Sequence, residues 1–497
     1  MPSYILSIDQ GTTGTTALIF DENLEIKGQA TTDFPQHFPK AGWVEHDLEE
    51  IWSSVCLSVK SALERASVPA SSIAAISLTN QRETSCLWDR ASGKPVAKAI
   101  VWQDRRTGPY CEQLKKKGVE REIIRRSGLL LDPYFSATKI VWMLKNIPGT
   151  KGLAKKGKIV FGTIDSFLLF RLSGNHVTEP SNASRTLLMN LKTCAWDDSL
   201  IKLFGIPRGI LPEIYPSAVE YGRTKGFPHL PDGIPITGMA GDQQAALFGQ
   251  ACLDQGTVKC TYGTGAFILA NTGNKPVFSR HRLLTTVAWK IGDTTTYGLE
   301  GSAFIAGAAV QWARDGLGII NKSSEIEALA RSVDDCDGVT FVPALSGIGA
   351  PHWLFRATGL LTGVTRRTTK GHIARAVLEG IAFQVRELLV AMTKDYGKKL
   401  SPIKVDGGAS ANNLLMQFQA DILNTEIVRS KIMETTALGS GLQAGLAIGM
   451  WKSFDEIRKK WKSAEAFRPQ MKTAESRRQI GRWDKAVSAV KLLANVR

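Results

Sequence analysis

The feature of this sequence that most constrains its fold is a short unit that occurs twice. Residues 5–20 read ILSIDQGTTGTTALIF and residues 258–270 read VKCTYGTGAFILA, each a strand-like run, a Gly/Thr turn and a second strand-like run. Each unit opens one half of the chain, which indicates two related halves. Glycine permits positive φ and lets backbone N–H groups approach a phosphate closely, and threonine adds hydroxyl donors. For either turn taken alone, a plain hairpin is the alternative.

The rest of the chain alternates between strand-like and helix-like segments. AAISLTN, KAIVWQ, KIVFGT, IPITGMA, TTTYGLEG, GVTFVPAL and IKVDGG are typical of strands. Residues 48–66, 372–396 and 412–424 have the apolar spacing of helices. This alternation predicts an α/β fold. We expect a hinge near residue 251, between the two repeated units, and therefore one domain at residues 1–251 and a second at residues 252–497.

Composition limits the classes of partner. The chain of 497 residues has 62 Lys and Arg against 46 Asp and Glu, a net charge of +16, which attracts anions. Its basic segments are not interleaved with aromatic residues, so we expect no nucleic-acid site. The seven cysteines are scattered and form no C-x-x-C pair, which favours a reducing, cytoplasmic setting. No stretch of about 18 residues lacks strongly polar groups, so no membrane span is expected.

A third glycine turn, KVDGGAS at residues 404–410, follows a strand-like run and precedes a helix. Its backbone N–H groups are therefore candidates for contact with a nucleotide. Two other glycine motifs are interpreted as structural. Residues 152–158 have phosphate-loop spacing, but they precede a strand and Ile159 replaces the required Ser or Thr. Residues 439–444 match a dinucleotide fingerprint without a preceding strand, which indicates close helix packing instead.

Polar loops follow three of the predicted strands, with the sequences NQRET (80–84), WQDRR (102–106) and GDQQ (241–244). Ligands in α/β sheets bind at the carboxyl ends of strands, so these loops are candidates for a substrate site. An Arg–Glu pair can donate to and accept from adjacent hydroxyls. The structural alternative is a surface ion pair for Arg82 and Glu83 and a core position for Trp102. For Asp242, which lies between glycine and two glutamines, we favour the functional interpretation.

Taken together, these segments resemble the FGGY family of carbohydrate kinases. The motifs that carry the resemblance are DQGTTGTTALIF, NQRET, VWQDRRT, AGDQQAALFGQ, YGTGAF, GSAFIAGAAVQWARDGL, DGGASANN and ETTALG, in this order. Residues 134–146 and 359–379 are similar to the two signatures of the family. The resemblance covers essentially the whole chain.

The resemblance implies two actin-like (ribonuclease-H-like) α/β domains with a nucleotide cleft between them. It also implies an activity: ATP, with Mg²⁺, phosphorylates a terminal hydroxyl of glycerol to give sn-glycerol 3-phosphate. The N-terminal domain would hold the glycerol site and the first phosphate loop, and the C-terminal domain the nucleotide site. The implied partners are glycerol and ATP, and a homodimer or homotetramer is compatible with the family.

The family's functional residues carry over where the motifs match. Asp9 resembles the magnesium-associated aspartate, and Asp242 is similar to the catalytic base. The implied phosphate contacts are Thr12, Thr13 and Gly14. The implied glycerol contacts are Arg82, Glu83, Trp102, Tyr134, Asp242, Gln243 and Phe267. The implied nucleotide contacts are Thr264, Gly307, Gln311, Gly408 and Asn412.

The first loop departs from the family pattern. Gly14-Thr15-Thr16 replaces the usual Ser-Ser-Arg, which removes one cation near the phosphates. The segment TKGFPHLPDGIPITG does not match the loop through which some members bind fructose 1,6-bisphosphate, so that regulation is not expected. Two alternatives stay open: a kinase of another small polyol or sugar, and a nucleotide-binding regulatory protein that has lost phosphoryl transfer.

Overall fold

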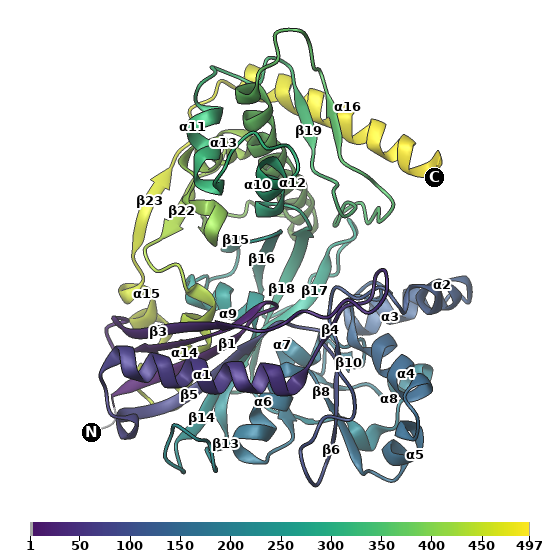
Figure 1. Ribbon diagram of the computed structural model, residues 1–497, viewed down its shortest axis with the longest axis vertical. Helices are drawn as coiled ribbons and strands as arrows, with labels where there is room; N and C mark the ends of the chain where they lie inside the picture. Colours follow the sequence, from purple (N-terminus) through teal and green to yellow (C-terminus); the bar gives the residue numbers. More distant parts are fainter. Residues whose placement is uncertain (1–2, 497) are drawn as a thin grey trace.

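The computed structural model describes residues 3–496 and contains two large mixed sheets (Figure 1). The first sheet has the strand order β13-β14-β5-β1-β2-β3. Its strands are β1 (Tyr4–Gln10), β2 (Gly14–Phe20), β3 (Ile26–Asp33), β5 (Ile73–Asn80), β13 (Ala218–Arg223) and β14 (Pro235–Gly241). The second sheet has the order β17-β18-β16-β15-β21-β22-β23. Its strands are β15 (Val258–Tyr262), β16 (Ala266–Gly273), β17 (Leu284–Ile291), β18 (Thr294–Ala303), β21 (Ile403–Asp406), β22 (Ile427–Ser430) and β23 (Ser463–Phe467).

The two sheets repeat one topology. In the first, the β1–β2 hairpin pairs through β1 with the parallel strand β5. In the second, the β15–β16 hairpin pairs through β15 with the parallel strand β21. A third antiparallel strand extends each hairpin, β3 in one sheet and β18 in the other. The two similar segments, residues 5–20 and 258–270, therefore form the same supersecondary unit in both halves.

Both faces of the first sheet are covered by helices. On one face, α1 (Leu48–Ala66) and α6 (Ile164–Ser173) pack over Leu6, Ile8 and their neighbours. On the other, α9 (Asp242–Gly249) and α14 (Thr435–Ala447) pack over Ile5 and its neighbours. Because adjacent strand residues point to opposite faces, β1 is buried on both faces, with Leu6 and Ile8 on one face and Ile5 and Ser7 on the other.

The second sheet carries α12 (Lys370–Tyr396) and α13 (Asn413–Leu423), and the long C-terminal helix α16 (Thr473–Val496) lies across the same end of the molecule (Figure 1). The remaining helices are α2 (Gly108–Lys116), α3 (Glu120–Ser127), α4 (Ser136–Asn146), α5 (Thr150–Lys155), α7 (Pro180–Ala183), α8 (Asp198–Phe204), α10 (Gly307–Asp315), α11 (Ile326–Ala330) and α15 (Phe454–Lys460). The remaining short strands are β4 (Glu45–His46), β6 (Cys86–Asp89), β7 (Ala99–Ile100), β8 (Ile159–Gly162), β9 (Val177–Thr178), β10 (Met189–Asn190), β11 (Ala195–Trp196), β12 (Glu213–Ile214), β19 (Thr340–Val342) and β20 (Leu360–Thr362). Short 3₁₀ turns occupy Ala70–Ser72, Arg208–Ile210, Ser323–Glu325 and Gly408–Ala411.

Two predicted strands are shorter than expected, because KAIVWQ contributes only β7 and GVTFVPAL only β19. Among residues 3–496, no helix has both the length and the apolar character needed to cross a bilayer.

Candidate active site

The carboxyl ends of three parallel strands meet at one edge of the first sheet. In the registers β1–β5 and β5–β14, Gln10 lies opposite Asn80, and Asn80 lies opposite Gly241. The first Gly/Thr turn, the NQRET loop and the start of α9 therefore leave the sheet side by side. This alignment brings together residues that are far apart in the sequence, at the edge where α/β sheets bind ligands.

Arg82 is the centre of the polar contacts at this edge. Its Nε forms an ion pair with Oδ1 of Asp242 at 3.0 Å, and its Nη1 donates to Oε1 of Gln244 at 3.2 Å. The same guanidinium binds both carboxylate oxygens of Glu300, with Nη2 to Oε1 at 3.1 Å. Only 3% of Arg82 is exposed, so the interpretation as a surface ion pair with Glu83 is wrong. The planar guanidinium fork suits this bidentate contact and fixes the direction of the side chain.

Glu83 lies next to Arg82 but has a different partner. Its Oε1 accepts from Nε of Arg185 at 2.6 Å. Its backbone has φ of 60°, a conformation that costs a non-glycine residue on the order of 1–3 kcal/mol and that clusters at functional sites. Ser136 Oγ donates to the Glu83 carbonyl at 3.0 Å and helps to hold it. Burial raises the pKa of Glu83, while Arg185 and Arg82 oppose that rise.

Three aromatic rings lie beside these polar groups. The Trp102 ring is 5.7 Å from Tyr134 and 6.2 Å from Phe267 between centroids, in edge-to-face arrangements. Trp102 Nε1 also donates to Oγ1 of Thr12 at 3.0 Å, which ties the aromatic group to the first Gly/Thr turn. Trp102 and Tyr134 come from the first half of the chain and Phe267 from β16. The structure thus places three of the residues predicted to contact glycerol next to one another.

Asp242 is the first residue of α9, directly after β14. A carboxylate is stabilised at a helix N-terminus, and here Oδ1 also accepts from the Gln243 backbone N–H at 2.6 Å. Its side chain is 29% exposed, in contrast to the buried Arg82 that binds it. Asp242 therefore has a fixed orientation together with an accessible surface, which is what a proton acceptor needs.

Asp9 lies close enough to Asp242 for the two carboxylates to repel. Burial raises the pKa of Asp9 well above its ordinary value, and the charges of Asp242 and Glu434 raise it further. Within residues 3–496, no group of three or more His, Cys, Asp or Glu side chains is arranged to hold a metal by itself. Mg²⁺ commonly takes one or two protein carboxylates and completes its shell with water and substrate phosphates. The acidic pair formed by Asp9 and Asp242 fits that mode of binding.

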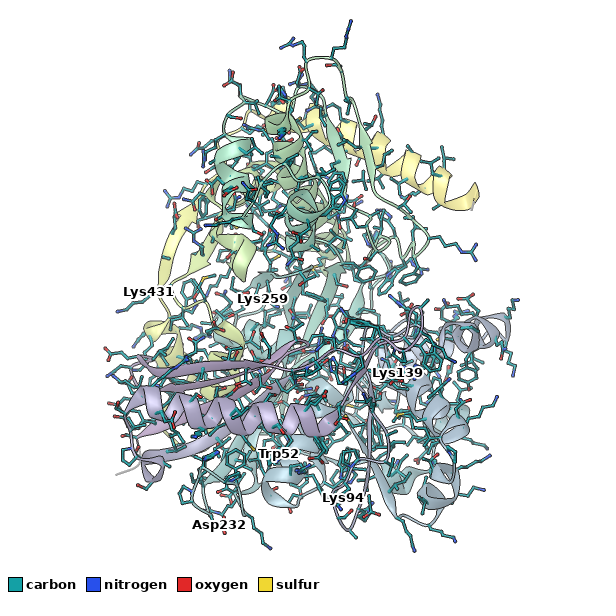
Figure 2. All side chains as sticks on the ribbon, in the orientation of Figure 1. Trp52, Lys94, Lys139, Asp232, Lys259 and Lys431 are labelled. Atoms are coloured by element: carbon teal, nitrogen blue, oxygen red, sulfur yellow. The ribbon has the colours of Figure 1, made fainter. Side chains whose placement is uncertain are left out.

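Gln243 and Lys259 connect the site to the second sheet. Lys259, labelled in Figure 2, is a buried residue of β15. Its Nζ donates to Oε1 of Gln243 and to Oγ1 of Thr261, the latter at 3.0 Å. Because the Gln243 oxygen accepts from Lys259, its amide NH₂ is left to donate elsewhere.

The residues predicted to contact the nucleotide lie around the second and third turns. The start of α10 packs on the second turn: the Gly307 N–H donates to the Gly263 carbonyl at 2.9 Å, and the Thr264 carbonyl accepts from Ala306 and Ala308. A Cβ on Gly307 would lie 2.7 Å from the Gly263 oxygen, so a side chain does not fit there. Gln311 is exposed on α10.

The third turn lies beside the second, because Thr261 of β15 pairs with Asp406 of β21. Gly408 follows at an exposed position with open space where a Cβ would be. Asn412 caps α13, with Oδ1 accepting from the Leu415 N–H at 2.8 Å. Its side-chain oxygen therefore has a structural task in addition to any contact with a ligand.

Both glycine motifs that the sequence analysis set aside are structural. Residues 152–158 cover the end of α5 and the turn into β8, so the order is helix then strand. Gly439 lies within α14, where an added Cβ would meet the Ala245 carbonyl oxygen of α9 at 1.8 Å. The small residues of this motif permit close packing of the two helices.

Four buried charged residues that hold the site were missed by the sequence analysis. Glu300 and Arg185 bind Arg82 and Glu83, and Lys259 binds Gln243. The fourth is Lys139, which Figure 2 labels. Its ammonium group donates to the backbone carbonyls of Tyr134 and Glu83. The sequence did carry one indication of three of them. Glu300, Lys259 and Lys139 are each a lone charged residue among mostly uncharged neighbours in a strand or helix.

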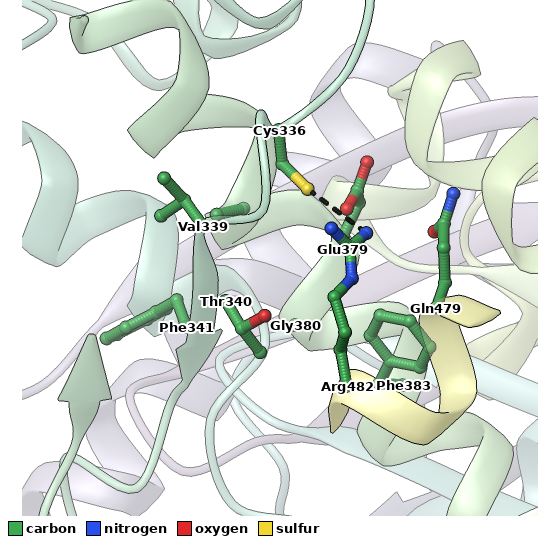
Figure 3. Close-up of a pocket in the computed structure, with 10 residues that line it drawn as sticks. Cys336, Val339, Thr340, Phe341, Glu379, Gly380, Phe383, Gln479 and Arg482 are labelled. Atoms are coloured by element: carbon green, nitrogen blue, oxygen red, sulfur yellow. Dashed lines mark hydrogen bonds between the residues drawn. The ribbon is translucent and has the colours of Figure 1, made fainter. Parts of the chain in front are cut away.

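A small enclosed cavity lies far from this site, between α12, β19 and α16 (Figure 3). Cys336, Glu379 and Arg482 line it, and Arg482 Nη2 approaches the Cys336 sulfur at 3.7 Å. Its volume of about 10 Å³ holds at most one water molecule, so it is a packing feature and no substrate site.

Comparison with known proteins identifies the family. The model of the FGGY carbohydrate kinase N-terminal domain matches residues 4–249, and that of the C-terminal domain matches residues 258–448. The chain is 54% identical to the glycerol kinase of Myxococcus xanthus over 97% of its own length and 98% of that protein.

Solved structures support the same conclusion. The crystal structure of Plasmodium falciparum glycerol kinase with ADP superposes with a TM-score of 0.92 at 39% identity, and 98% of each chain is covered. The gluconate kinase of Lactobacillus acidophilus shares the fold, with a TM-score of 0.89 at 24% identity over 99% of this chain and 98% of that one. The expected fold of two actin-like α/β domains is confirmed. The chain belongs to the FGGY family of carbohydrate kinases.

Proposed function

We propose that this protein transfers the γ-phosphoryl group of ATP to a terminal hydroxyl of glycerol, giving sn-glycerol 3-phosphate and ADP. The observation that carries the proposal is the set of fixed polar groups on Arg82, Glu83 and Asp242 beside the rings of Trp102, Tyr134 and Phe267. Relatives above 50% identity over nearly their whole length are glycerol kinases, which supports the same substrate.

Fixed hydrogen-bonding groups are the means by which a site can select a molecule as small as glycerol. Arg82 and Gln243 offer donors, and Glu83 and Asp242 offer acceptors, so neighbouring hydroxyls find complementary partners. A molecule without one of these hydroxyls leaves a buried polar group unpaired, which weakens its binding strongly. The aromatic rings contact the carbon backbone and limit the room for longer polyols.

Asp242 acts as the base in this mechanism. An alcohol is about as weak an acid as water, so its pKa lies far above that of free Asp, which is ~3.9. Asp242 therefore does not ionise glycerol in advance. It aligns the hydroxyl and accepts the proton late, as the new P–O bond forms and the bond to the ADP oxygen breaks.

The phosphates of ATP are assigned to the Gly/Thr turns and the adenosine part to the second half of the chain. The first turn offers Thr12, Thr13 and Gly14, and the second offers Thr264. The nucleotide would lie in a cleft between the two domains, with contacts to Gly307, Gln311, Gly408 and Asn412. The ADP in the Plasmodium falciparum relative supports a nucleotide site in this fold. Mg²⁺ held near Asp9 would neutralise charge on the transferred group.

The experiment is a product-identified assay with Mg-ATP and a panel of glycerol, erythritol, ribitol and xylulose. We expect the highest kcat/KM for glycerol and a product with phosphate on a terminal carbon. Equal or faster turnover of a five-carbon substrate would contradict the proposal. ATP binding without any phosphorylated product would favour the regulatory alternative.

A further inference from the structure

The side chains that meet the polyol in the proposed function are themselves held by one carboxylate from the opposite sheet. Glu300, on β18, accepts from both Nη1 and Nη2 of Arg82, and its Oε1 also accepts from Nη2 of Arg185 at 2.9 Å. Arg185 in turn donates from Nε to Glu83. Glu300 therefore contacts Arg82 directly and Glu83 through a single intermediate.

These four side chains form a buried, electrically balanced group. Glu300 and Arg185 have no exposed surface, Glu83 is 1% exposed and Arg82 is 3% exposed. Two guanidinium groups and two carboxylates are present, so every charge has a partner of opposite sign. Burial would by itself raise the pKa of Glu300, but Arg185 and Arg82 lower it below its ordinary value, so Glu300 is ionised.

The position of Glu300 in the sheet explains why it reaches the site. Glu300 pairs with Leu269 of β16, and Leu269 pairs with Lys259 of β15, so the three share one face of the second sheet. Phe267 lies two residues from Leu269 and projects from the same face. From this face, Lys259 binds Gln243 and Glu300 binds Arg82. Phe267 adds an aromatic ring beside Trp102.

We propose that Glu300 is a positioning residue of the polyol site, which fixes the guanidinium of Arg82 and, through Arg185, the carboxylate of Glu83. The inference rests on the proposed function and adds to it: the recognition groups of the first sheet depend on a carboxylate that the second sheet supplies. Glu300 does not touch the reacting atoms. It affects the affinity for the polyol, because it sets the orientation of the Arg82 and Glu83 side chains.

The first test is Glu300→Gln, assayed for the KM of glycerol and of ATP separately. The substituted amide turns a donor NH₂ toward one of the two guanidinium groups, which then loses its acceptor. We expect the KM for glycerol to rise about tenfold or more, with the KM for ATP within about twofold of wild type. Glu300→Asp keeps the charge but reaches only one arginine, so an intermediate KM for glycerol is expected.

A second variant separates positioning from charge balance. Glu300→Gln combined with Arg185→Gln leaves one buried positive and one buried negative charge, so it restores neutrality but removes both anchors. We expect its KM for glycerol to stay high. The matched control is Glu379→Gln, which removes a buried carboxylate paired with Arg375 on α12, far from the site, and leaves the KM for glycerol unchanged.

Three results would overturn the inference. They are an unchanged KM for glycerol in folded Glu300→Gln, an equal rise in both KM values, and recovery of glycerol affinity in the charge-balanced double variant. If Glu300→Gln does not fold, Glu300→Asp and the double variant decide the question by the same criteria. Failure of wild-type protein to phosphorylate glycerol would instead contradict the proposed function, which the wild-type assay tests first.

Discussion

At the scale of single residues, Asp242 offers the sharpest test of the mechanism. Asp242→Asn keeps an oxygen that can lie beside Arg82 Nε and accept from the Gln243 N–H, so the local geometry is preserved. It removes the basic group. We expect turnover to fall about 10²–10⁴-fold while ADP binding is retained.

The control for this measurement is Asp254→Asn, which changes an exposed aspartate paired with Arg458. It should leave turnover unchanged. Turnover near the wild-type rate in folded Asp242→Asn, by coupled ADP release, would remove Asp242 from the mechanism.

Thr16 occupies the position where the family pattern has arginine. It pairs across the strands with Asp9, so both side chains share one face, and its hydroxyl hydrogen-bonds to that of Thr31 at 2.9 Å. In Thr16→Arg, a cation would lie beside the acidic group around Asp9 and near the expected phosphates. A charge-assisted hydrogen bond contributes about 1.5–3 kcal/mol, and exposure reduces this. We therefore expect the KM for ATP to fall by about tenfold or less.

The KM for ATP and kcat should be measured at low and at physiological salt, because a charge effect weakens as salt rises. Thr362→Arg, at an exposed position of β20 in the second half of the chain, serves as the control for a general gain in positive charge. A loss in both parameters for folded Thr16→Arg would refute the idea of a missing cation.

Lys139 gives a prediction about stability and pH. Burial lowers its pKa to about 8 from 10.5, although Glu83 and Asp104 partly offset the shift. Between these two pH values the unfolded chain binds the lysine proton and the folded chain does not, so this group makes the protein more stable as pH rises from 8 to 10.5. The full effect is on the order of 3 kcal/mol.

The measurement is denaturant unfolding of wild type and Lys139→Met at several pH values from 7 to 10.5. The free energy of unfolding of wild type should rise relative to that of the variant across this range. A constant difference between the two proteins would show that Lys139 keeps an ordinary pKa.

The residues proposed to touch a ligand were easier to predict from the sequence than the residues that hold their side chains. Asp242 and Arg82 lie in polar loops after strands, where a functional interpretation is natural. Glu300 and Arg185 have no such setting, because their partners are 102 to 218 positions away. A buried ion pair between distant segments leaves no local pattern, so only the three-dimensional arrangement identifies it.

At the scale of elements, strands with a local apolar pattern were predicted from the sequence, and a strand without one was missed. The apolar strands β1, β2, β5 and β14 were predicted, because their runs of buried residues are visible in the sequence. The edge strand β3 was missed, since IKGQATTD is mostly polar and includes a glycine. That glycine is required by packing: a Cβ on Gly28 would lie 2.3 Å from the Ala62 carbonyl oxygen of α1.

The contact between α9 and α14 depends on glycine in a way that can be measured. Gly439→Ala would place a methyl group 1.8 Å from the Ala245 carbonyl oxygen, so the helices must separate. Overpacking of this kind costs about 1–3 kcal/mol or more. We expect a clear fall in the melting temperature and in the yield of soluble protein.

The matched control is Gly481→Ala in α16, where nothing lies within 4 Å of the added Cβ. Alanine favours a helix by about 0.5–1 kcal/mol over glycine, so this variant should be as stable as wild type or more stable. Equal stability of the two variants would show that the helix contact is not tight.

At the scale of the whole molecule, the boundary expected at residue 251 stays a prediction. All strands of the first sheet precede that residue and all strands of the second follow it. However, α14 comes from the second half of the chain and covers β1, β5 and β14 of the first. The two halves therefore share a core, which local sequence patterns did not reveal.

A fragment of residues 1–251 tests this shared core. Without α14, the sheet face that includes Ile5, Leu18 and Phe20 would lose its cover. We expect the fragment alone to aggregate or to bind a hydrophobic dye, and to unfold without a cooperative transition. Coexpression with residues 252–497 should restore a soluble complex. A monomeric, cooperatively folding fragment would contradict the prediction.

The long sequence separation between the first sheet and α14 has a consequence for how the protein is made. The ribosome releases the last strand of that sheet, β14, about two hundred residues before the end of α14. At a synthesis rate of roughly 5–20 residues per second, one face of the nascent sheet stays exposed for on the order of 10–40 s before α14 is made. During that interval the exposed face is a binding surface for molecular chaperones. Ribosome-bound chains stalled near residue 300 should therefore be captured by a general chaperone, and chains stalled near residue 490 should escape it.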